Sequence, residues 1–325
     1  MKQSAGVLTC SGNACPLVWN LEFKHDAGDG PMADNTVTTH DHLSYPGFCA
    51  AGGDPRQPIL CLHCSTGSSR QWRSLAAFLG DRHRVIAPDL LGYGNNPPWA
   101  PNWGLRLETE VRRLLQLMAS APGPVDVAAH SFGAAVAIKL ALLHPEKVRS
   151  LTVYEPVLFA LLRQDADSRA ALAEILTASS EIGHSLADGN TDAAAQAFID
   201  FWSGDGTWTS MPKARRQGVS ARIEKVRADF HALLADETTL SELAQLDIPV
   251  LCLSGEQSPA VTRRIADLLC AALPRVKSKR FEDMGHMGPL TNARLVNNSI
   301  EEFLKFLPVQ PAAGATYTPV TARAA

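Results

Sequence analysis

The sequence predicts an α/β fold in which a mostly parallel central sheet is flanked by helices and carries an inserted helical cap. Short, unbroken apolar runs typical of buried strands alternate with segments of helical periodicity, which indicates a parallel sheet covered on both faces. This alternation is interrupted once, over residues 157–246, where the patterns are helical only. With 325 residues, of which 46% are hydrophobic, the chain is long enough to bury a core of this size.

The elements of the predicted core follow from apolar spacing and from the glycines and prolines between them. Strand patterns occupy, in chain order, residues 40–48, 58–64, 83–94, 124–130, 148–156, 248–255 and 276–286. Helical spacing occupies residues 70–80, 111–118, 133–144 and 262–274, and a last helix places Ile300, Phe303, Leu304 and Leu307 on one face. We therefore assign residues 39–156 and 247–307 to one core.

Three segments lie outside this core. The cap, residues 157–246, contains several helical patterns and no convincing strand. Residues 1–38 show no sustained periodicity, and we interpret them as a flexible N-terminal extension, with Met32 as an alternative start. Residues 308–325 contain too little apolar surface to offset the entropy of ordering, so we expect a flexible C-terminal tail.

The composition favours a small-molecule substrate. The 30 basic and 33 acidic residues nearly balance, so the chain has no electrostatic footprint for nucleic acid or an anionic membrane, and no apolar run is long enough to span a bilayer. The seven cysteines are odd in number and most lie in apolar patterns, which favours reduced thiols and a cytoplasmic location. Cys10 and Cys15 lack the partners of a zinc site. We expect no metal, no cofactor, and a monomer or homodimer.

The stretch VDVAAHSFGAAVAIKL, residues 125–140, changes from a strand pattern to an apolar helical pattern at Ser131. A sharp turn at that point tolerates only small neighbours, and Ala129, Gly133 and Ala134 meet this demand. A serine at the start of a helix also lies beside the positive end of the helix dipole. Ser131 is therefore a candidate nucleophile, although serine in this place also serves as an ordinary helix cap.

This strand, turn, serine and helix pattern resembles the nucleophile elbow of the α/β-hydrolase family, whose motif is small-x-Ser-x-Gly. Ala129 stands at the first small position, where glycine is commoner. The resemblance covers residues 44–307 and implies an α/β-hydrolase fold with a serine nucleophile and a histidine base. The segment FEDMGHMGPL places His286 in the loop after the last strand pattern, much as the family presents its catalytic histidine.

The resemblance also implies an oxyanion hole made of two backbone amides. The segment LHCSTGSSRQW contains His63 and occupies the place of the family's His-Gly-rich turn, with Cys64 where glycine is usual. By position, the amides of Ser65 and Phe132 form the hole, and Thr66 is the alternative to Ser65. We expect His63 to orient this turn and His130 to be a packing residue beside the elbow.

The triad acid is not at its usual place. A Ser–His pair needs a carboxylate to hold the imidazole, and the family commonly supplies it from a Gly-x-x-Asp loop. Here that loop ends in Ser258. Two carboxylates remain as candidates, Glu155 at the end of the strand pattern 148–156 and Glu256, two positions before Ser258. We favour Glu155, because some relatives carry the acid on that strand and because a buried acid needs a partner.

Together these residues predict a serine hydrolase, most simply a carboxylesterase, that cleaves an ester-like bond of a small hydrophobic substrate through an acyl-enzyme. Two alternatives stay open. The missing acid at position 258 suggests a homologue that binds a small ligand with little or no catalysis. Other relatives use a similar serine for C–C bond hydrolysis or cofactor-free haloperoxidase chemistry. Apolar candidates for the substrate pocket are Leu158, Phe159, Trp202, Trp208 and Phe230.

Overall fold

The computed structural model describes residues 35–38, 44–50, 54, 58–100, 104–119, 121 and 123–307, with only the backbone of residues 35–38, 44 and 45. The flexible ends expected at residues 1–38 and 308–325 lie outside the described residues, except for the strand at Asn35–Thr38.

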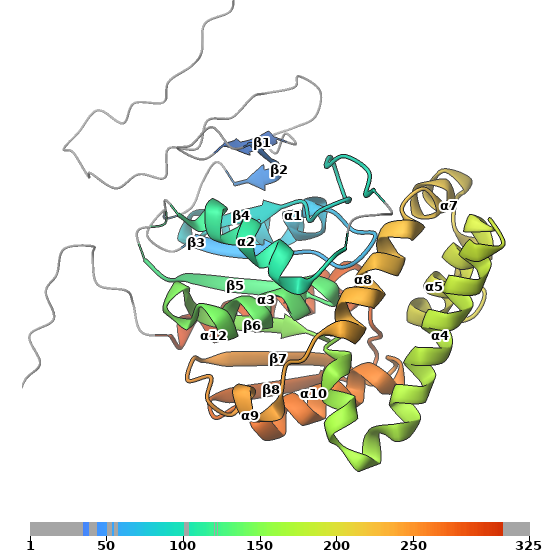
Figure 1. The fold of residues 1–325 in the computed structure, drawn as a ribbon. Coiled ribbons are helices and arrows are strands. Elements are labelled where there is room, and N and C mark those ends of the chain that lie inside the picture. Colours follow the sequence, from blue (N-terminus) through green and yellow to red (C-terminus); the bar gives the residue numbers. More distant parts are fainter. Residues whose placement is uncertain are drawn as a thin grey trace, which may run out of the picture.

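Within the described chain, eight strands form one sheet in the order β1-β2-β4-β3-β5-β6-β7-β8 (Figure 1). β2 pairs antiparallel with β1 and β4, and all other pairs are parallel, so the predicted mostly parallel sheet is confirmed. The sheet begins at β1, before position 39, where we expected the core to start. The strands are β1 (Asn35–Thr38), β2 (Ser44–Cys49), β3 (Pro58–Leu62), β4 (Arg84–Pro88), β5 (Val125–His130), β6 (Val148–Tyr154), β7 (Val250–Gly255) and β8 (Val276–Phe281).

Helices cover both faces of this sheet. The period of two along β3 sends Leu60 and Leu62 into one hydrophobic cluster, and Ile59 and Cys61 into the other. The first cluster includes residues of α2 (Leu107–Met118), α3 (Phe132–Leu143) and α10 (Ala260–Ala272). The second includes residues of α1 (Arg73–Leu79) and α12 (Ala293–Lys305). The predicted two-faced α/β architecture is therefore present.

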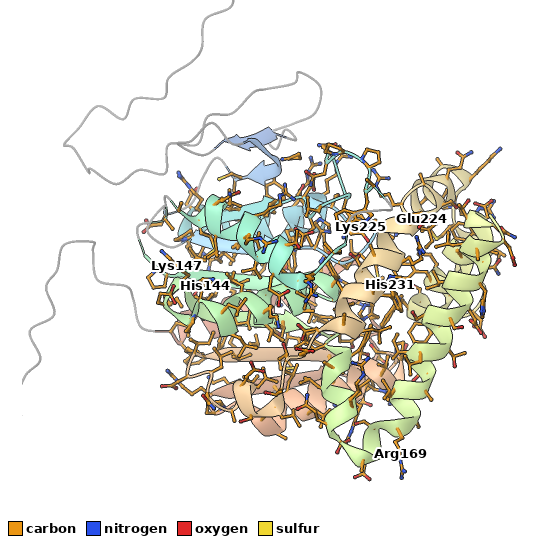
Figure 2. The ribbon with its side chains drawn as sticks, in the orientation of Figure 1. His144, Lys147, Arg169, Glu224, Lys225 and His231 are labelled. Atoms are coloured by element: carbon orange, nitrogen blue, oxygen red, sulfur yellow. The ribbon has the colours of Figure 1, made fainter. Side chains whose placement is uncertain are left out.

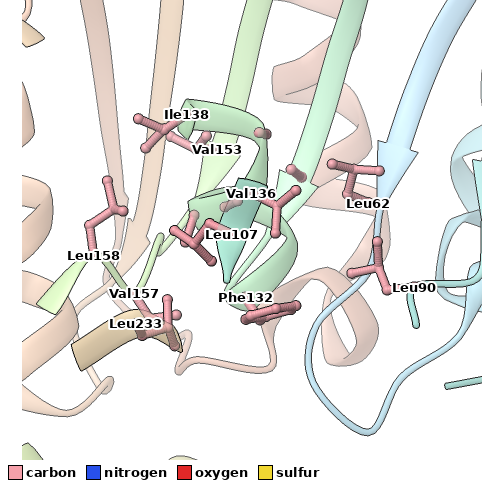
Figure 3. Packing of buried hydrophobic residues seen from close by; sticks show 14 of the residues in the cluster. Leu62, Leu90, Leu107, Phe132, Val136, Ile138, Val153, Val157, Leu158 and Leu233 are labelled. Atoms are coloured by element: carbon pink, nitrogen blue, oxygen red, sulfur yellow. The ribbon is translucent and has the colours of Figure 1, made fainter. Parts of the chain in front are cut away.

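Helix α3 is apolar around most of its surface, as expected for a helix that neighbouring elements largely cover. It packs against α2 and against strands β5 and β6. Figure 3 shows its Phe132, Val136 and Ile138 among apolar side chains of neighbouring elements, including Val153. This packing holds the first turn of α3, which follows Ser131, in a fixed place.

The segment between β6 and β7 is described throughout, and its regular elements are all helical. It lies beyond the carboxyl ends of the parallel strands (Figure 1), where the sequence analysis expected a cap. No helix in the described part of the chain combines the length and apolarity needed to cross a bilayer. The helices of this segment are α4 (Arg169–Ala187), α5 (Thr191–Ser203), α6 (Thr207–Ser210), α7 (Lys213–Ser220), α8 (Ile223–Ala235) and α9 (Leu240–Leu243); α11 (Gly288–Thr291) follows β8, and short 3₁₀ turns occur at Ser69–Trp72, Gly80–Arg82, Pro145–Lys147, Phe159–Gln164 and Ala166–Ser168.

Gly133 sets how closely α3 approaches the end of β3. A Cβ atom at this position would lie 2.5 Å from the backbone oxygen of His63 and 2.7 Å from that of Leu62. Both atoms belong to the backbone and cannot rotate away. The small residue two positions after Ser131 is therefore required by this approach, as the sequence pattern predicted.

We expect Gly133→Ala to lower the free energy of unfolding by about 1–3 kcal/mol, because the added methyl group overpacks backbone against backbone. Gly183→Ala, inside α4, is the matched control. A Cβ atom there meets nothing within 4 Å, so this change should stabilise the helix by about 0.5–1 kcal/mol. Urea denaturation measures both, and equal effects at the two glycines would contradict the close approach.

Candidate active site

Ser131 lies in a strained turn between β5 and α3. Its backbone has φ 56° and ψ −119°, a region that side chains with a Cβ atom seldom adopt and that costs about 1–3 kcal/mol. Its amide donates a 3.0 Å hydrogen bond to the carbonyl of Tyr154, which ties the turn to the end of β6. This turn presents the Ser131 hydroxyl at the carboxyl edge of the sheet.

Three predicted side chains meet at this edge. The Ser131 hydroxyl is 2.9 Å from Nε2 of His286, and Nδ1 of His286 is 2.7 Å from Oε2 of Glu155. Since a carboxylate only accepts, Nδ1 carries the proton and Nε2 accepts from the serine. Ser131, His286 and Glu155 are 6%, 3% and 0% exposed. The structure thus joins them in one buried chain of hydrogen bonds.

Glu155 is held by more than the imidazole. Its Oε1 accepts hydrogen bonds from the amide of Gly255 at 2.7 Å and from the hydroxyl of Ser258 at 2.5 Å. Ser258, which stands where the family commonly has its acid, therefore donates to the Glu155 carboxylate. The side chain of Glu256, the alternative acid, is exposed, and no contact joins it to His286 in the described structure.

Backbone strain is concentrated at this site. Among the described residues, only three other than glycine have a positive φ, namely Thr66 (61°), Ser131 (56°) and Glu155 (45°). Thr66 belongs to the turn after β3, and the other two belong to the hydrogen-bonded chain. Strained backbone persists only where surrounding contacts over-determine it, and it is typical of functional sites.

His63 fixes the turn that follows β3. The amide of Leu90 donates to its Nε2 at 2.9 Å, so Nδ1 carries the proton and donates to the carbonyl of Cys64 at 2.7 Å. The same carbonyl accepts from the amide of Gly67 at 3.0 Å and closes the turn. Burial lowers the pKa of His63 to about 4, so the ring is neutral at pH 7. These contacts orient the turn as the sequence predicted for His63.

The two amides expected to form an oxyanion hole are free donors. Within the described chain, neither the Ser65 amide nor the Phe132 amide has a hydrogen-bond acceptor. The neighbouring Cys64 amide, by contrast, donates to Oε1 of Gln71 at 3.2 Å. The side chain of Cys64 is buried, and this burial raises the pKa of its thiol to about 12.

Sequence reasoning missed a second set of hydrogen bonds, which reaches the loop that carries His286. Nε2 of Gln71 is 3.2 Å from Nδ1 of His130, and Nε2 of His130 is 2.8 Å from the carbonyl of His286. The Tyr154 hydroxyl donates to the carbonyl of Gly285 at 2.8 Å. His130 was expected only to pack, and this is corrected: it links the turn after β3 to the loop that carries His286. No local sequence pattern predicts these contacts.

A cavity of about 1530 Å³ lies over Ser131 and His286, between the sheet edge and the helical segment that joins β6 to β7. Three of the residues predicted to form the pocket, Phe159, Trp202 and Phe230, line this cavity. The indole of Trp202 also stacks on the His286 imidazole, with ring centroids 4.4 Å apart and planes inclined by 30°.

Two of the nominated pocket residues do not line this cavity. Leu158 (Figure 3) and Trp208 are buried in the hydrophobic core, because core packing and ligand contact have the same apolar signature in sequence. Within the described residues, no cluster of His, Cys, Asp or Glu has the arrangement of a metal site.

Comparison with known protein families identifies the family of this chain. Residues 57–293 match the sequence profile of the family described as alpha/beta hydrolase fold. The chain belongs to the α/β-hydrolase family. The resemblance and fold class predicted from the sequence are thereby confirmed.

Individual relatives of this α/β-hydrolase are distant. Lipase LipV of Mycobacterium tuberculosis is 39% identical over 99 residues, which are 30% of this chain and 36% of that lipase. Lipase 1 of Psychrobacter immobilis is 23% identical over 284 residues, covering 84% of this chain and 83% of the relative. The crystal structure of an α/β-hydrolase from Sphaerobacter thermophilus aligns with a TM-score of 0.60 at 23% identity, covering 83% and 99% of the two chains. These likenesses support the fold and a hydrolase activity.

The buried neutral His63 should make stability fall with acidity. Its folded pKa of about 4 lies below the ordinary value of 6.5, so the unfolded chain binds the proton first as the pH falls. This contribution is complete above pH 6.5 and is lost between pH 6.5 and 4, by about 2 kcal/mol at pH 5. Urea unfolding at pH 7 and 5 measures it. His63→Asn should show a smaller loss, and an unchanged loss would refute the assignment.

Proposed function

We propose that this α/β-hydrolase is a serine hydrolase that cleaves an ester-like bond of a small hydrophobic substrate through an acyl-enzyme, with the specificity of a carboxylesterase. One observation carries the proposal: a serine in a strained turn, an imidazole and a carboxylate form a continuous buried chain of hydrogen bonds. A helix cap would require neither the imidazole nor the carboxylate. The lipase names of two relatives support the same chemistry.

The proposed reaction begins with proton transfer from Ser131 to Nε2 of His286 as Oγ attacks the substrate carbonyl. The amides of Ser65 and Phe132 then donate to the oxyanion of the tetrahedral intermediate. His286 returns its proton to the leaving alcohol oxygen, which gives the acyl-enzyme. A water molecule, deprotonated by His286, then attacks the carbonyl of the acyl-enzyme. The bond from that carbon to Oγ breaks, His286 returns the proton to Ser131, and the acid is released. Throughout, Glu155 holds the imidazole in place and stabilises its cation.

The cavity supports a hydrophobic acyl group. Val157, Phe159, Phe198, Phe230 and Leu233 line it from the cap side. Such walls bind alkyl or aromatic groups by removing their apolar surface from water.

The alternative of a non-catalytic ligand-binding homologue rested on the missing acid at position 258. The Glu155 carboxylate lies 2.7 Å from Nδ1 of His286, a contact that supports a catalytic protein over this alternative. C–C bond hydrolysis and haloperoxidase chemistry use a similar serine, and they are separated from ester hydrolysis by the substrate test below.

A fluorophosphonate probe should label wild-type protein on Ser131 alone, and Ser131→Ala should remain unlabelled, because only an activated hydroxyl attacks the phosphonate. Peptide mass spectrometry locates the adduct. For p-nitrophenyl esters, kcat/KM should rise roughly three- to fourfold for each CH₂ that the cavity buries. Absence of labelling would indicate ligand binding instead, whereas labelling without ester turnover would indicate another serine-dependent reaction.

Glu155→Gln should lower kcat by on the order of 10³- to 10⁴-fold, because the imidazole loses the carboxylate that sets its tautomer and stabilises its cation. Glu256→Gln is the matched control, since this side chain is exposed and should leave kcat within about twofold. Steady-state hydrolysis of p-nitrophenyl butyrate measures both. The opposite ranking would transfer the acid role to Glu256.

A further inference from the structure

Helix α8 of the cap carries two ion pairs with very different surroundings. Glu224 and Arg227 pair at the surface, with side chains 38% and 36% exposed. Lys225 and Asp229, one turn apart on the same helix, also pair, but each side chain is only 1% exposed. Figure 2 labels Glu224 and Lys225 as neighbours on this helix. A buried ion pair is costly to desolvate, so its retention calls for further partners.

The partners of Asp229 lie in the α/β core. Its Oδ2 accepts a 2.6 Å hydrogen bond from the hydroxyl of Ser65 and another from the hydroxyl of Tyr93. Its Oδ1 accepts from the ammonium of Lys225. Ser65 follows Cys64 in the turn after β3, it lines the cavity, and its amide has no hydrogen-bond acceptor in the described chain. The cap carboxylate therefore holds the side chain of a residue whose backbone amide is proposed to act in catalysis.

The ammonium of Lys225 also lies near three aromatic rings. Its Nζ lies 4.7 Å from the ring centroid of Phe132, 4.5 Å from that of Tyr93 and 5.6 Å from that of Trp99. Gly92, at φ 73°, makes room for the stem, because a Cβ atom there would lie 3.1 Å from Cγ of Lys225. A desolvated ammonium over ring faces is held by cation–π attraction. The cation thus contacts Phe132, the residue that follows the nucleophile.

We propose that Lys225 and Asp229 are positioning residues for the oxyanion hole, Asp229 through the Ser65 hydroxyl and Lys225 through the Phe132 ring. The inference rests on the proposed function, since it assigns these two amides to the hole. One buried pair contacts both residues that supply the donors, and it comes from the cap. The hole is then complete only while α8 is seated on the core, and the cap contributes to transition-state stabilisation as well as to substrate choice.

A purely structural role predicts different behaviour. If the pair only fastens the cap to the core, variants that keep the protein folded keep its turnover. If it positions the hole, kcat falls while KM changes little, because the oxyanion exists only in the transition state. A test therefore needs variants that remove the polar contacts without leaving a buried charge.

The first variant combines Tyr93→Phe, Lys225→Met and Asp229→Leu, because apolar replacement of a buried ion pair is often neutral for stability. The second, Ser65→Ala, removes only the hydroxyl and keeps the ion pair. We expect kcat for p-nitrophenyl acetate to fall roughly 10- to 100-fold in the triple variant and roughly 10-fold in Ser65→Ala. KM should stay within about threefold, and the urea midpoint of each variant shows that it is folded. Glu224→Gln, on the exposed pair of the same helix, should keep kcat within about twofold.

A folded triple variant with wild-type kcat would overturn the proposal and leave the pair as a fastening of the cap. Should the triple variant fail to fold, Ser65→Ala decides, and wild-type kcat in that variant overturns the proposal equally. A wild-type protein that neither turns over the ester nor reacts with the fluorophosphonate probe would overturn the proposed function itself, which is a separate result.

Discussion

The hydrogen bond between His286 and Glu155 joins residues 131 positions apart, and it is the contact on which the arrangement of the site depends. Glu155 follows β6, Gly255 ends β7 and His286 follows β8, so three adjacent strands converge on one carboxylate. Parallel strands make this convergence possible, because their carboxyl ends lie at one edge of the sheet. Both oxygens of the carboxylate take part in hydrogen bonds, and the imidazole bound to one of them lies 2.9 Å from the Ser131 hydroxyl.

The fold maintains this arrangement against local backbone preference. Thr66, Ser131 and Glu155 all have a positive φ, and each such conformation costs on the order of 1–3 kcal/mol. The opposing stabilisation comes from packing, since α3 is enclosed by apolar neighbours and Gly133 lets it approach β3. The strain is thus localised where hydroxyl, carboxylate and turn must face one another.

Two helices of the segment between β6 and β7 contact residues of the candidate site. Trp202 of α5 stacks on the His286 imidazole, and Asp229 of α8 accepts a hydrogen bond from the Ser65 hydroxyl. A cap that only admitted or excluded substrate would need neither contact. In the proposed reaction, the inserted helices would therefore contribute both to substrate selection and to the geometry of the reacting groups.

Local pattern in the sequence determined much of this protein. Periodicity placed the strands and helices, the small residues around Ser131 specified the elbow, and a glycine-flanked loop pointed to His286, because backbone sterics and side-chain alternation act over a few residues. The choice of Glu155 over Glu256 depended on which loop faces the imidazole. Lys225 and Asp229, spaced as an ordinary surface pair, showed no sign of burial, and Leu158 had the same apolar character as true pocket residues. Only the tertiary structure decided these points, because contacts between distant segments depend on how whole elements pack, which short-range pattern does not encode.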